Sequence, residues 1–560
     1  MTHTGNTSGK LELTWSNKEQ RLLAHDDITY EWVDPSDWRV SEVRLLDEVA
    51  THGTNSGDNL LIQGDALHAL EALACIPEYA ERYLGRVKLC YLDLPFNTGQ
   101  TFQQYDDNLE HSVWLTMLRD RLEQIHRLLA DRGSVWVHLD DTEVHRARCV
   151  LDEVFGADKY VGTVIWRSSD NSNNDALGLS LDHNEILVYA KSPGWKSNRL
   201  EATLDRLPHY GNPDDDPRGP WFDGNPVNSP SPRPNLRYSL TGPDGQEISP
   251  PANGWRWERT TLDAKFASGE VYYNESGTGI KRRTYLADHK GLPPSSLWTD
   301  IEVTRRDPAG RPTQRRIPHG HNRGAKNHLK ALFGLPARHV FATPKPEQLL
   351  SKVVRLGTDP GDIVLDCFAG SGTTAAVAHK MGRRWITVEL SADTVDTFAR
   401  PRLLKVLDGS DPGGITDAVG WQGGGGFTEV KVAPSMFERV ASHVVLSDWA
   451  VNGQLAEAVA AQLKFTREPD GPFIGRRGRT RLAVLDGMVT AGLAEHLVSQ
   501  LGEQETVVVV AMALEEGIAE HLRALRPGSR ARKVPRDLAR SGKIPPRLVR
   551  LRSTNGGGAR

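Results

Sequence analysis

The fold is decided by the stretch Pro360-Gly361-Asp362-Ile363-Val364-Leu365-Asp366-Cys367-Phe368-Ala369-Gly370-Ser371-Gly372-Thr373-Thr374. Its apolar run, residues 363–365, predicts a buried strand, and the small residues after it predict a turn into a helix at 374–380. Glycines at such a turn let the backbone approach a ligand closely. The next apolar strand, 385–388, ends in Glu389, 23 positions beyond Asp366. An acid there can accept both hydroxyls of a ribose, so the pattern predicts a nucleoside site, although glycines alone often serve only helix–strand packing.

A chain of 560 residues is long enough for about two to four domains. Its four cysteines, Cys75, Cys90, Cys149 and Cys367, form no Cys-x-x-Cys pair and have no metal-ligand spacing. This pattern argues against disulfides and structural zinc. We expect no signal peptide, because residues 1–10 lack an apolar core, and no membrane span, because no run of about 18 apolar residues occurs. These features predict a cytoplasmic protein that needs no metal.

A second motif follows an earlier predicted strand, residues 87–92, and reads Asp93-Leu94-Pro95-Phe96-Asn97-Thr98-Gly99. A carboxylate, a proline and an aromatic ring at the carboxyl end of a buried parallel strand lie where open α/β sheets place ligands. An ordinary turn closed by proline is the plainer alternative. Around this motif, strands and helices alternate at a spacing that predicts a mostly parallel sheet covered on both faces. The predicted strands are 60–62, 134–139, 161–166 and 186–190, and the predicted helices are 67–74, 114–129, 143–155 and 344–358.

The segment from 196 to 340 differs in composition from the regions on either side. Proline, glycine and aspartate dominate residues 207–254, and residues 281–330 carry 12 Lys and Arg against 4 Asp and Glu, although the whole chain has a net charge of −4. Interleaved aromatic residues indicate an inserted domain with long loops, not a linker. A basic, loop-rich insert is typical of DNA binding, although a solvated face is the alternative that charge alone leaves open. The predicted DNA contacts are Arg282, Arg283, Arg305, Arg306, Arg315 and Arg316.

The two ends of the chain carry weaker signals. Residues 1–58 are polar and irregular and predict an N-terminal arm, and the glycine-rich stretch 411–426 marks a boundary or a close turn. Residues 431–535 predict a small α/β module without an active-site motif, and the basic tail, 536–560, is predicted to be flexible. Within the module the predicted strands are 481–485 and 506–511, and the predicted helices are 492–501 and 518–525.

The order Asp93-Leu94-Pro95-Phe96, basic insert, Asp366-x-Phe368-x-Gly370-x-Gly372 resembles that of the β-class amino-methyltransferases of DNA. The closest resemblance is to the modification (Mod) subunits of type III restriction systems. Their usual catalytic string is Asp-Pro-Pro-Tyr-Asn-Thr-Gly, and residues 93–99 match five of its seven letters. Further agreement lies in Gly64-Asp65, His111-Ser112-x-Trp114-Leu115, Asp140-Asp141, Ser296-Leu297-Trp298-Thr299-Asp300 and Pro344-Lys345-Pro346-Glu347.

This resemblance implies a Rossmann-like α/β sheet of the S-adenosylmethionine-dependent methyltransferases, with a permuted motif order. It divides the chain into an N-terminal arm (1–58), a catalytic half (59–195), an inserted target-recognition region (196–340), a cofactor-binding half (341–430), a C-terminal α/β module (431–535) and a flexible basic tail (536–560). S-adenosylmethionine is then expected at Asp65, Lys345, Asp366, Phe368, Ala369, Gly370, Gly372, Thr373 and Glu389. The implied catalytic residues are Asp93, Leu94, Pro95 and Phe96.

The chemistry explains why these residue types are needed. The exocyclic amine of adenine is a poor nucleophile, because its lone pair is delocalised into the ring. The Asp93 carboxylate and the Leu94 carbonyl would accept hydrogen bonds from its two N–H groups. These bonds would localise the lone pair on the nitrogen for direct attack on a sulfonium methyl. Phe96 would stack on the base after it is flipped from the duplex. The family has proline where Leu94 stands and tyrosine where Phe96 stands; leucine leaves the rigidity of the turn in question, and we predict that activity is retained.

The resemblance implies site-specific N6-adenine methylation of double-stranded DNA, in a restriction-modification or phage-defence system. It also implies a homodimer and a separate nuclease–helicase subunit, since no Gly-x-x-x-x-Gly-Lys-[Ser/Thr] loop occurs. N4 methylation of cytosine is the first alternative, although serine is common there at the position of Asp93. A DNA-recognition subunit with weak transfer is the second. C5 methylation is disfavoured because no Pro-Cys pair occurs, and RNA methylation because no RNA-binding module is visible.

Overall fold

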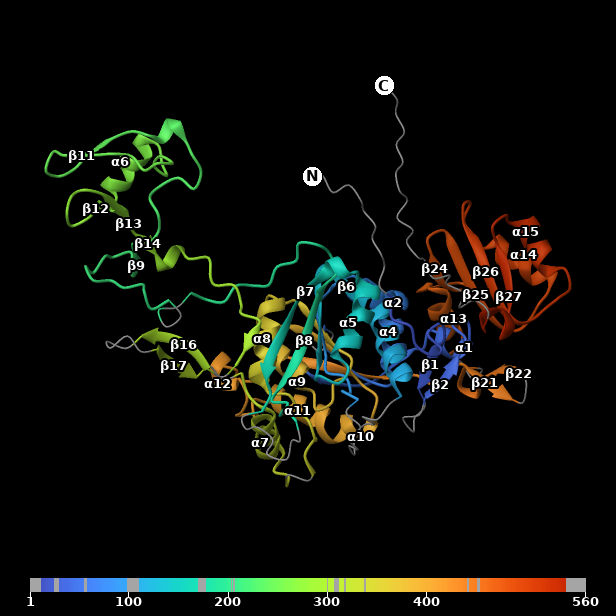
Figure 1. The fold of residues 1–560 in the computed structure, drawn as a ribbon. Coiled ribbons are helices and arrows are strands. Elements are labelled where there is room, and N and C mark those ends of the chain that lie inside the picture. The colour runs from blue at the N-terminus through green and yellow to red at the C-terminus, as the bar shows by residue number, and fades with distance from the viewer. Residues whose placement is uncertain are drawn as a thin grey trace. The chain divides into compact units, whose positions relative to one another are not determined.

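The computed structural model describes residues 12–24, 30–54, 58–97, 110–169, 178–202, 204, 207–299, 301–306, 312–316, 319–336, 339–440, 443–450 and 454–539. The chain divides into two compact units (Figure 1). The first unit comprises Met1–Lys196, Ser296–Trp298 and His319–Arg560, and the second comprises Ser197–Ser295 and Thr299–Pro318.

The first unit is built on a ten-stranded sheet. In spatial order its strands are β15 (Leu297–Trp298), β7 (Tyr160–Arg167), β8 (His183–Ala190), β6 (Leu129–Leu139), β5 (Val87–Leu92), β18 (Ile363–Asp366), β19 (Arg384–Glu389), β4 (Leu60–Gln63), β20 (Gly426–Val432) and β3 (Leu46–Gly53). The six strands from β6 to β20 are mutually parallel. Strand β8 runs antiparallel to both of its neighbours, and β3 runs antiparallel to β20. The predicted α/β fold with a mostly parallel sheet is therefore confirmed.

Strands β5 and β18 are far apart in the sequence and adjacent in the sheet. They pair in parallel, with Cys90 opposite Leu365. Because the carboxyl ends of parallel strands meet at one edge of a sheet, the residues that follow β5 and β18 emerge side by side. This pairing brings the two sequence motifs together.

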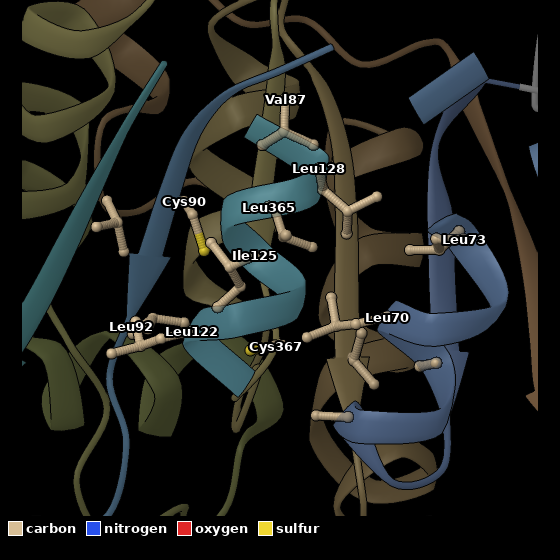
Figure 2. Close-up of a cluster of buried hydrophobic side chains, with 14 of the residues drawn as sticks. Leu70, Leu73, Val87, Cys90, Leu92, Leu122, Ile125, Leu128, Leu365 and Cys367 are labelled. Atoms are coloured by element: carbon tan, nitrogen blue, oxygen red, sulfur yellow. The ribbon is translucent and has the colours of Figure 1, made fainter. Parts of the chain in front are cut away.

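Helices cover both faces of the sheet, as predicted. Helices α2 (Ala66–Cys75), α3 (Pro77–Tyr83), α4 (His111–Leu128) and α5 (Val144–Phe155) pack on one side, whereas α8 (Glu347–Gly357), α9 (Thr373–Lys380) and α11 (Arg400–Leu407) cover the other (Figure 1). Figure 2 shows Leu70 and Leu73 of α2 with Leu122, Ile125 and Leu128 of α4, around Cys90 and Leu365 of the sheet. In α4 the apolar residues recur every three or four positions, so one face of the helix is buried.

The N-terminal segment is more regular than the sequence suggested. It forms the hairpin β1 (Arg21–Ala24) and β2 (Tyr30–Val33), the short helix α1 (Trp38–Ser41), and β3, which is an edge strand of the main sheet. Strand β3 is exposed at five of its eight positions, so it lacks the run of buried apolar residues that identifies a central strand. An edge strand of this kind gives little signal in the sequence.

Three element boundaries also differ from expectation. Helix α8 begins at Glu347, because Pro346 ends the extended segment before it and serves as its N-cap. Strand β6 begins at Leu129, ahead of Gly133, and so includes a glycine that was expected to precede it. The glycine-rich stretch leads directly into β20, which crosses the expected boundary at 430 and completes the parallel part of the sheet.

The second unit consists of short elements around a small core. Its elements are β9 (Trp221–Phe222), β10 (Leu240–Thr241), β11 (Glu247–Ile248), α6 (Arg259–Ala267), β12 (Val271–Tyr273), β13 (Ile280–Arg282), β14 (Thr284–Tyr285), β16 (Ile301–Arg306) and β17 (Pro312–Arg316). Trp255, Leu262 and Val271 lie in its core. The unit ends at residue 318, earlier than the expected boundary at 340, because α7 (Asn322–Phe333) packs in the first unit through Leu329 and Leu332, against Phe341 and Phe398.

The C-terminal module has its own five-stranded sheet, ordered β23 (Thr466–Asp470), β24 (Phe473–Arg477), β25 (Thr480–Val489), β26 (Thr506–Leu514) and β27 (Arg530–Lys533). Its helices α14 (Ala491–Ser499) and α15 (Ile518–Leu525) agree with the predicted ranges. The module also contains β21 (Phe437–Val440), β22 (His443–Leu446), α13 (Leu455–Leu463) and α16 (Arg536–Ala539). Two short helices, α10 (Ala392–Thr394) and α12 (Thr416–Val419), precede it in the chain. Helix α16 lies within the segment predicted to be a flexible tail, and residues 540–560 lie outside the described residues.

Two predicted absences can be compared with the structure. Cys75, Cys90, Cys149 and Cys367 are all free thiols. Among the described helices, none combines the length and the apolar composition that crossing a bilayer requires.

Leu365 is completely buried in the core shared by β5 and β18. Truncating a buried leucine to alanine removes apolar contacts and leaves a cavity, which lowers stability by about 2–5 kcal/mol. We expect Leu365→Ala to lower the free energy of unfolding by this amount, measured by urea denaturation followed by circular dichroism. Leu179, which is 90 % exposed, provides the control. Leu179→Ala should change stability by less than about 0.5 kcal/mol, and equal losses in the two variants would contradict this account of the core.

Candidate functional site

A cavity of about 910 Å³ opens at the carboxyl ends of the parallel strands in the first unit. Residues from both sequence motifs line it, so the structure brings them to one place. The predicted site residues that line it are Asp65, Asp93, Leu94, Pro95, Phe96, Lys345, Asp366, Phe368, Ala369, Gly370, Thr373 and Glu389. Gly372 lies next to this wall, where it is the N-cap of α9.

The turn between β18 and α9 forms one wall of the cavity. Gly370 has a φ of +49°, and a Cβ added there would lie 2.9 Å from Phe341 Cζ, so a larger residue would not fit. The Phe368 N–H donates to Asp366 Oδ1 at 2.9 Å, and the Ala369 N–H donates to the Val388 carbonyl at 2.9 Å. These bonds hold the backbone of the turn against the ends of β18 and β19.

Two carboxylates stand beside this turn with raised pKa values. Glu389, at the tip of β19, accepts the Gly370 N–H at 2.8 Å and the Ser391 N–H at 3.0 Å. Burial raises the pKa of Glu389 to about 7, and these backbone N–H groups act in the opposite direction. Burial also raises the pKa of Asp366 to about 7, opposed by hydrogen bonds from Thr374 and Phe368. Both carboxyl groups therefore titrate near neutral pH.

Asp65 lines the cavity just beyond β4, the strand that pairs with β19. Its side chain caps α2 by accepting the Leu67 N–H at 2.7 Å, and Arg121 Nη2 lies 2.7 Å from its second oxygen. Burial works against ionisation, but the charge of buried Arg121 keeps the pKa of Asp65 below its usual value. Asp65 is thus a rigid, charged acceptor.

At the tip of β5, Asp93 and Phe96 have defined partners. Lys345 Nζ lies 2.7 Å from Asp93 Oδ1 and 4.8 Å from the centroid of the Phe96 ring. Burial raises the pKa of Asp93, and Lys345 lowers it. The Phe96 ring stacks on His138, with centroids 5.6 Å apart, and the Tyr91 hydroxyl hydrogen-bonds His138 Nδ1 at 2.6 Å. Phe96 therefore packs against the ring of His138, which is itself fixed by its hydrogen bond to Tyr91.

The turn after Asp93 is held by packing where the family pattern would use a second proline. Leu94 is 1 % exposed and belongs to the main core, and Trp114 Nε1 donates to the Pro95 carbonyl at 2.7 Å. These contacts constrain the backbone that leucine alone would leave free. Thr98 and Gly99, the last letters of the motif, lie outside the described residues.

Residues 87–400, more than half of the chain, match a protein family described as DNA methylase. The chain belongs to this DNA methylase family. It is 28% identical over 506 residues to a probable type III restriction-modification enzyme HindVI Mod subunit of Haemophilus influenzae, covering 77% of this chain and 63% of that protein. It is 27% identical over 403 residues to the type III restriction-modification enzyme StyLTI Mod subunit of Salmonella typhimurium, covering 62% and 57%. The chain thus spans less than two thirds of the length of each of these relatives.

The methylase also contains a supporting contact that sequence analysis missed. Glu143 is fully buried, and its carboxylate contacts Asn97 Nδ2 at 2.9 Å and His111 Nδ1 at 2.5 Å. It joins the end of the Asp93 motif to the start of α4. A single acid near the start of a helix has no distinctive pattern in a sequence, so nothing could have pointed to it.

A buried charge cluster behind the glycine turn was also missed. The side chains of His328, Glu347 and Asp411 bring possible ligand atoms within 4.8 Å of one another, as a metal site would. Lys380 Nζ, however, lies 2.8 Å from Glu347 and 2.7 Å from Asp411, and Arg402 Nη2 lies 2.9 Å from Glu347. Because two cations already neutralise these carboxylates, the cluster is a salt-bridge network. Arg402 also donates to Thr373 Oγ1 at 2.7 Å and so supports the glycine turn.

The arginines predicted to contact DNA belong to the second unit. Arg283 is paired with Asp214 and Asp216 inside the second unit, and Arg282 lies 5.6 Å from the Trp257 ring. Arg305, Arg306, Arg315 and Arg316 lie on β16 and β17, which form an antiparallel hairpin. Arg282 and Arg283 thus have local partners within the unit.

The raised pKa of Glu389 predicts a pH-dependent stability. Its folded pKa of about 7 is above the value of about 4.3 expected in the unfolded chain. The native state therefore binds the proton more tightly, and the stability it contributes is present below about pH 4.3 and is lost as pH rises through 7. Glu389→Gln removes this titration, so its unfolding free energy should decline less steeply between about pH 5 and 8 than that of the wild type, measured by urea denaturation at each pH.

Glu520, which is 72% exposed, provides the control for this measurement. Glu520→Gln should keep the wild-type slope. A Glu389→Gln variant as steep as the wild type would contradict the assignment of a raised pKa to Glu389.

Proposed function

We propose that this methylase transfers a methyl group from S-adenosylmethionine to N6 of adenine in double-stranded DNA. The observation that carries the proposal is that Asp93 and the Gly370 turn open into one cavity. Asp93 can accept a hydrogen bond from an amine, and the Gly370 turn suits a nucleoside. Because both line one cavity, a methyl donor and an amine could bind there side by side.

The residues present fit S-adenosylmethionine. Glu389 uses one lone pair of each oxygen for backbone N–H groups, which leaves both oxygens able to accept ribose hydroxyls. Glycine at 370 keeps the wall of the cavity open to the donor, and Asp65, just beyond β4, offers a charged acceptor in the same cavity. When bound, this cosubstrate supplies an electrophilic methyl group on a sulfonium.

The chain's own residues would position and activate the amine. Asp93 accepts one N–H of the exocyclic amine and the Leu94 carbonyl accepts the other, which draws the nitrogen lone pair out of the ring. Phe96, supported by His138, stacks on the flipped base and fixes its plane. The nitrogen would then bond to the methyl carbon while the carbon–sulfur bond breaks and the sulfur keeps the electron pair. The methylated nitrogen would release its extra proton to the Asp93 carboxylate. Positioning and electrostatics supply most of the catalysis in such a direct transfer.

Aspartate at position 93 favours adenine over cytosine, since the cytosine-N4 enzymes commonly have serine at this place. The Mod subunits among the relatives suggest a setting. We place the protein in a restriction-modification or phage-defence system in the cytoplasm, as a homodimer that serves a separate nuclease–helicase subunit. The second unit would then recognise the target sequence through its basic β16–β17 hairpin.

A product assay tests the reaction. Purified protein is incubated with labelled S-adenosylmethionine and duplex DNA of mixed sequence, and the modified nucleoside is identified by mass spectrometry. We expect N6-methyladenine, and a loss of at least about 10²-fold in rate for Asp93→Ala, because the amine loses an acceptor made for the transition state. Exposed Asp486 supplies the control, and Asp486→Ala should keep the wild-type rate. N4-methylcytosine as the product would overturn the choice of base, and DNA binding without transfer would favour a recognition subunit.

The hairpin assignment makes a separate prediction about salt. Each phosphate that the protein no longer neutralises lowers the slope of log K against log salt by about 1. We expect the double variant Arg305→Glu, Arg315→Glu to weaken DNA binding and flatten this slope, measured by fluorescence anisotropy between about 50 and 200 mM salt. Arg259 on α6, which is 55% exposed, is the matched control within the same unit. If Arg259→Glu weakened binding equally, the effect would come from overall charge and not from the hairpin.

A further inference from the structure

Lys345 makes two contacts that the proposed reaction reserves for the target base. Its ammonium lies 2.7 Å from Asp93 Oδ1 and 4.8 Å from the centroid of the Phe96 ring, and its side chain is only 7% exposed. In the reaction proposed above, an amine N–H donates to the same carboxylate and a base stacks on the same ring. In the protein alone, the ammonium therefore occupies both groups that the incoming base would contact.

The main chain at this position is held in place. Prolines 344 and 346 flank Lys345 and restrict φ at both neighbours. Glu347, the next residue but one, is fully buried and bonded to Lys380, Arg402 and the Ile415 N–H at 2.8–3.0 Å. The backbone is thus anchored on both sides, so only the side chain of Lys345 has freedom to move.

The cavity offers the displaced ammonium other partners. Asp366 and Glu389 also line it, and both are carboxyl groups near their titration midpoint at neutral pH. A lysine ammonium sits on a flexible four-carbon stem and can exchange one carboxylate for another without backbone movement. These carboxyl groups are the counter-ions that the displaced ammonium would use.

We propose that Lys345 is a positioning residue whose ammonium holds the place of the target amine on Asp93 and Phe96 until the base enters and displaces it. This inference rests on the proposed methyl transfer. Before entry the lysine keeps Asp93 charged and oriented, and during entry the base must replace an ion pair with a neutral hydrogen bond. Lys345 therefore acts both on the charge of Asp93 and on the affinity for the flipped base.

The charge effect has a defined sign. The titratable groups that face Asp93 are Lys345 from the segment before α8, Asp366 from β18 and Tyr91 from its own strand. Among them only the lysine lowers the pKa of Asp93. Removing its charge moves the pKa of Asp93 upward, so a larger fraction of Asp93 is protonated at neutral pH.

The test compares Lys345→Met, Lys345→Arg and the wild type in the full chain. The methylated site is first identified by sequencing DNA modified by the wild type. The second-order rate constant kcat/KM for DNA is then measured against pH at saturating donor, because it reports the pKa of Asp93 before the base displaces Lys345. We expect the acid limb of Lys345→Met to shift upward by at least about one pH unit, whereas Lys345→Arg, which keeps the charge, retains the wild-type limb.

The second measurement is binding of a duplex that carries this site, without donor, compared with a duplex that lacks it. Lys345→Met should bind the site duplex about fivefold more tightly than the wild type and bind the other duplex equally well. Lys352 on α8, whose ammonium lies 4.3 Å from the Trp298 ring, supplies the control. Lys352→Met should shift neither the pH limb nor the preference for the site.

The outcomes separate the two claims. Wild-type transfer together with an unshifted pH limb and unchanged site binding in Lys345→Met would overturn the place-holding role and leave the proposed function intact. A wild type that transfers no methyl group to DNA would overturn the function and this inference together.

Discussion

Parallel hydrogen bonding between β5 and β18 is the constraint on which the rest of the site depends. The register Val87–Ile363, Leu89–Val364 and Cys90–Leu365 sets the level at which both strands end. Both strands are buried on both faces, so a slip by one residue would turn every side chain to the wrong face of the sheet. Because Asp366 ends β18 and Asp93 directly follows β5, both carboxyl groups lie at the same edge of the sheet, and the cavity exists as a consequence of sheet register.

Charge in this cavity is balanced closely. Asp93, Asp366 and Glu389 are three carboxyl groups lining one cavity, and burial raises the pKa of each. Lys345 is the cation that contacts Asp93. Partial burial lowers the local dielectric constant, which strengthens the electrostatic interactions among these groups. A low local dielectric constant favours tight orientation of a polar base. It also makes the charged form of each carboxyl group less stable when no ligand is bound.

The surrounding structure stiffens the site from several directions. Arg402 and Glu347 tie the glycine turn to the segment that carries Lys345. Glu143 joins the Asp93 motif to α4, and Arg121 holds Asp65 in place. Preorganised groups of this type need little reorganisation when a ligand binds, which is the usual source of catalytic advantage in transfer reactions. Glu143, Glu347 and Arg402 are therefore part of the site although they do not line the cavity, whereas Arg121 does line it.

The sequence by itself determined the α/β class, the two motifs and the strands and helices that carry them. Those features depend on local patterns: apolar runs, helical periodicity and glycines at a strand-to-helix turn. The sequence did not predict the edge strand β3, because exposed strands lack such a pattern. It also did not predict the contacts of Glu143 and Arg402 or the ion pair of Lys345 with Asp93. Only the tertiary structure decided these, since a buried charge is stabilised by partners that are distant in the chain, and their meeting depends on sheet order and helix packing.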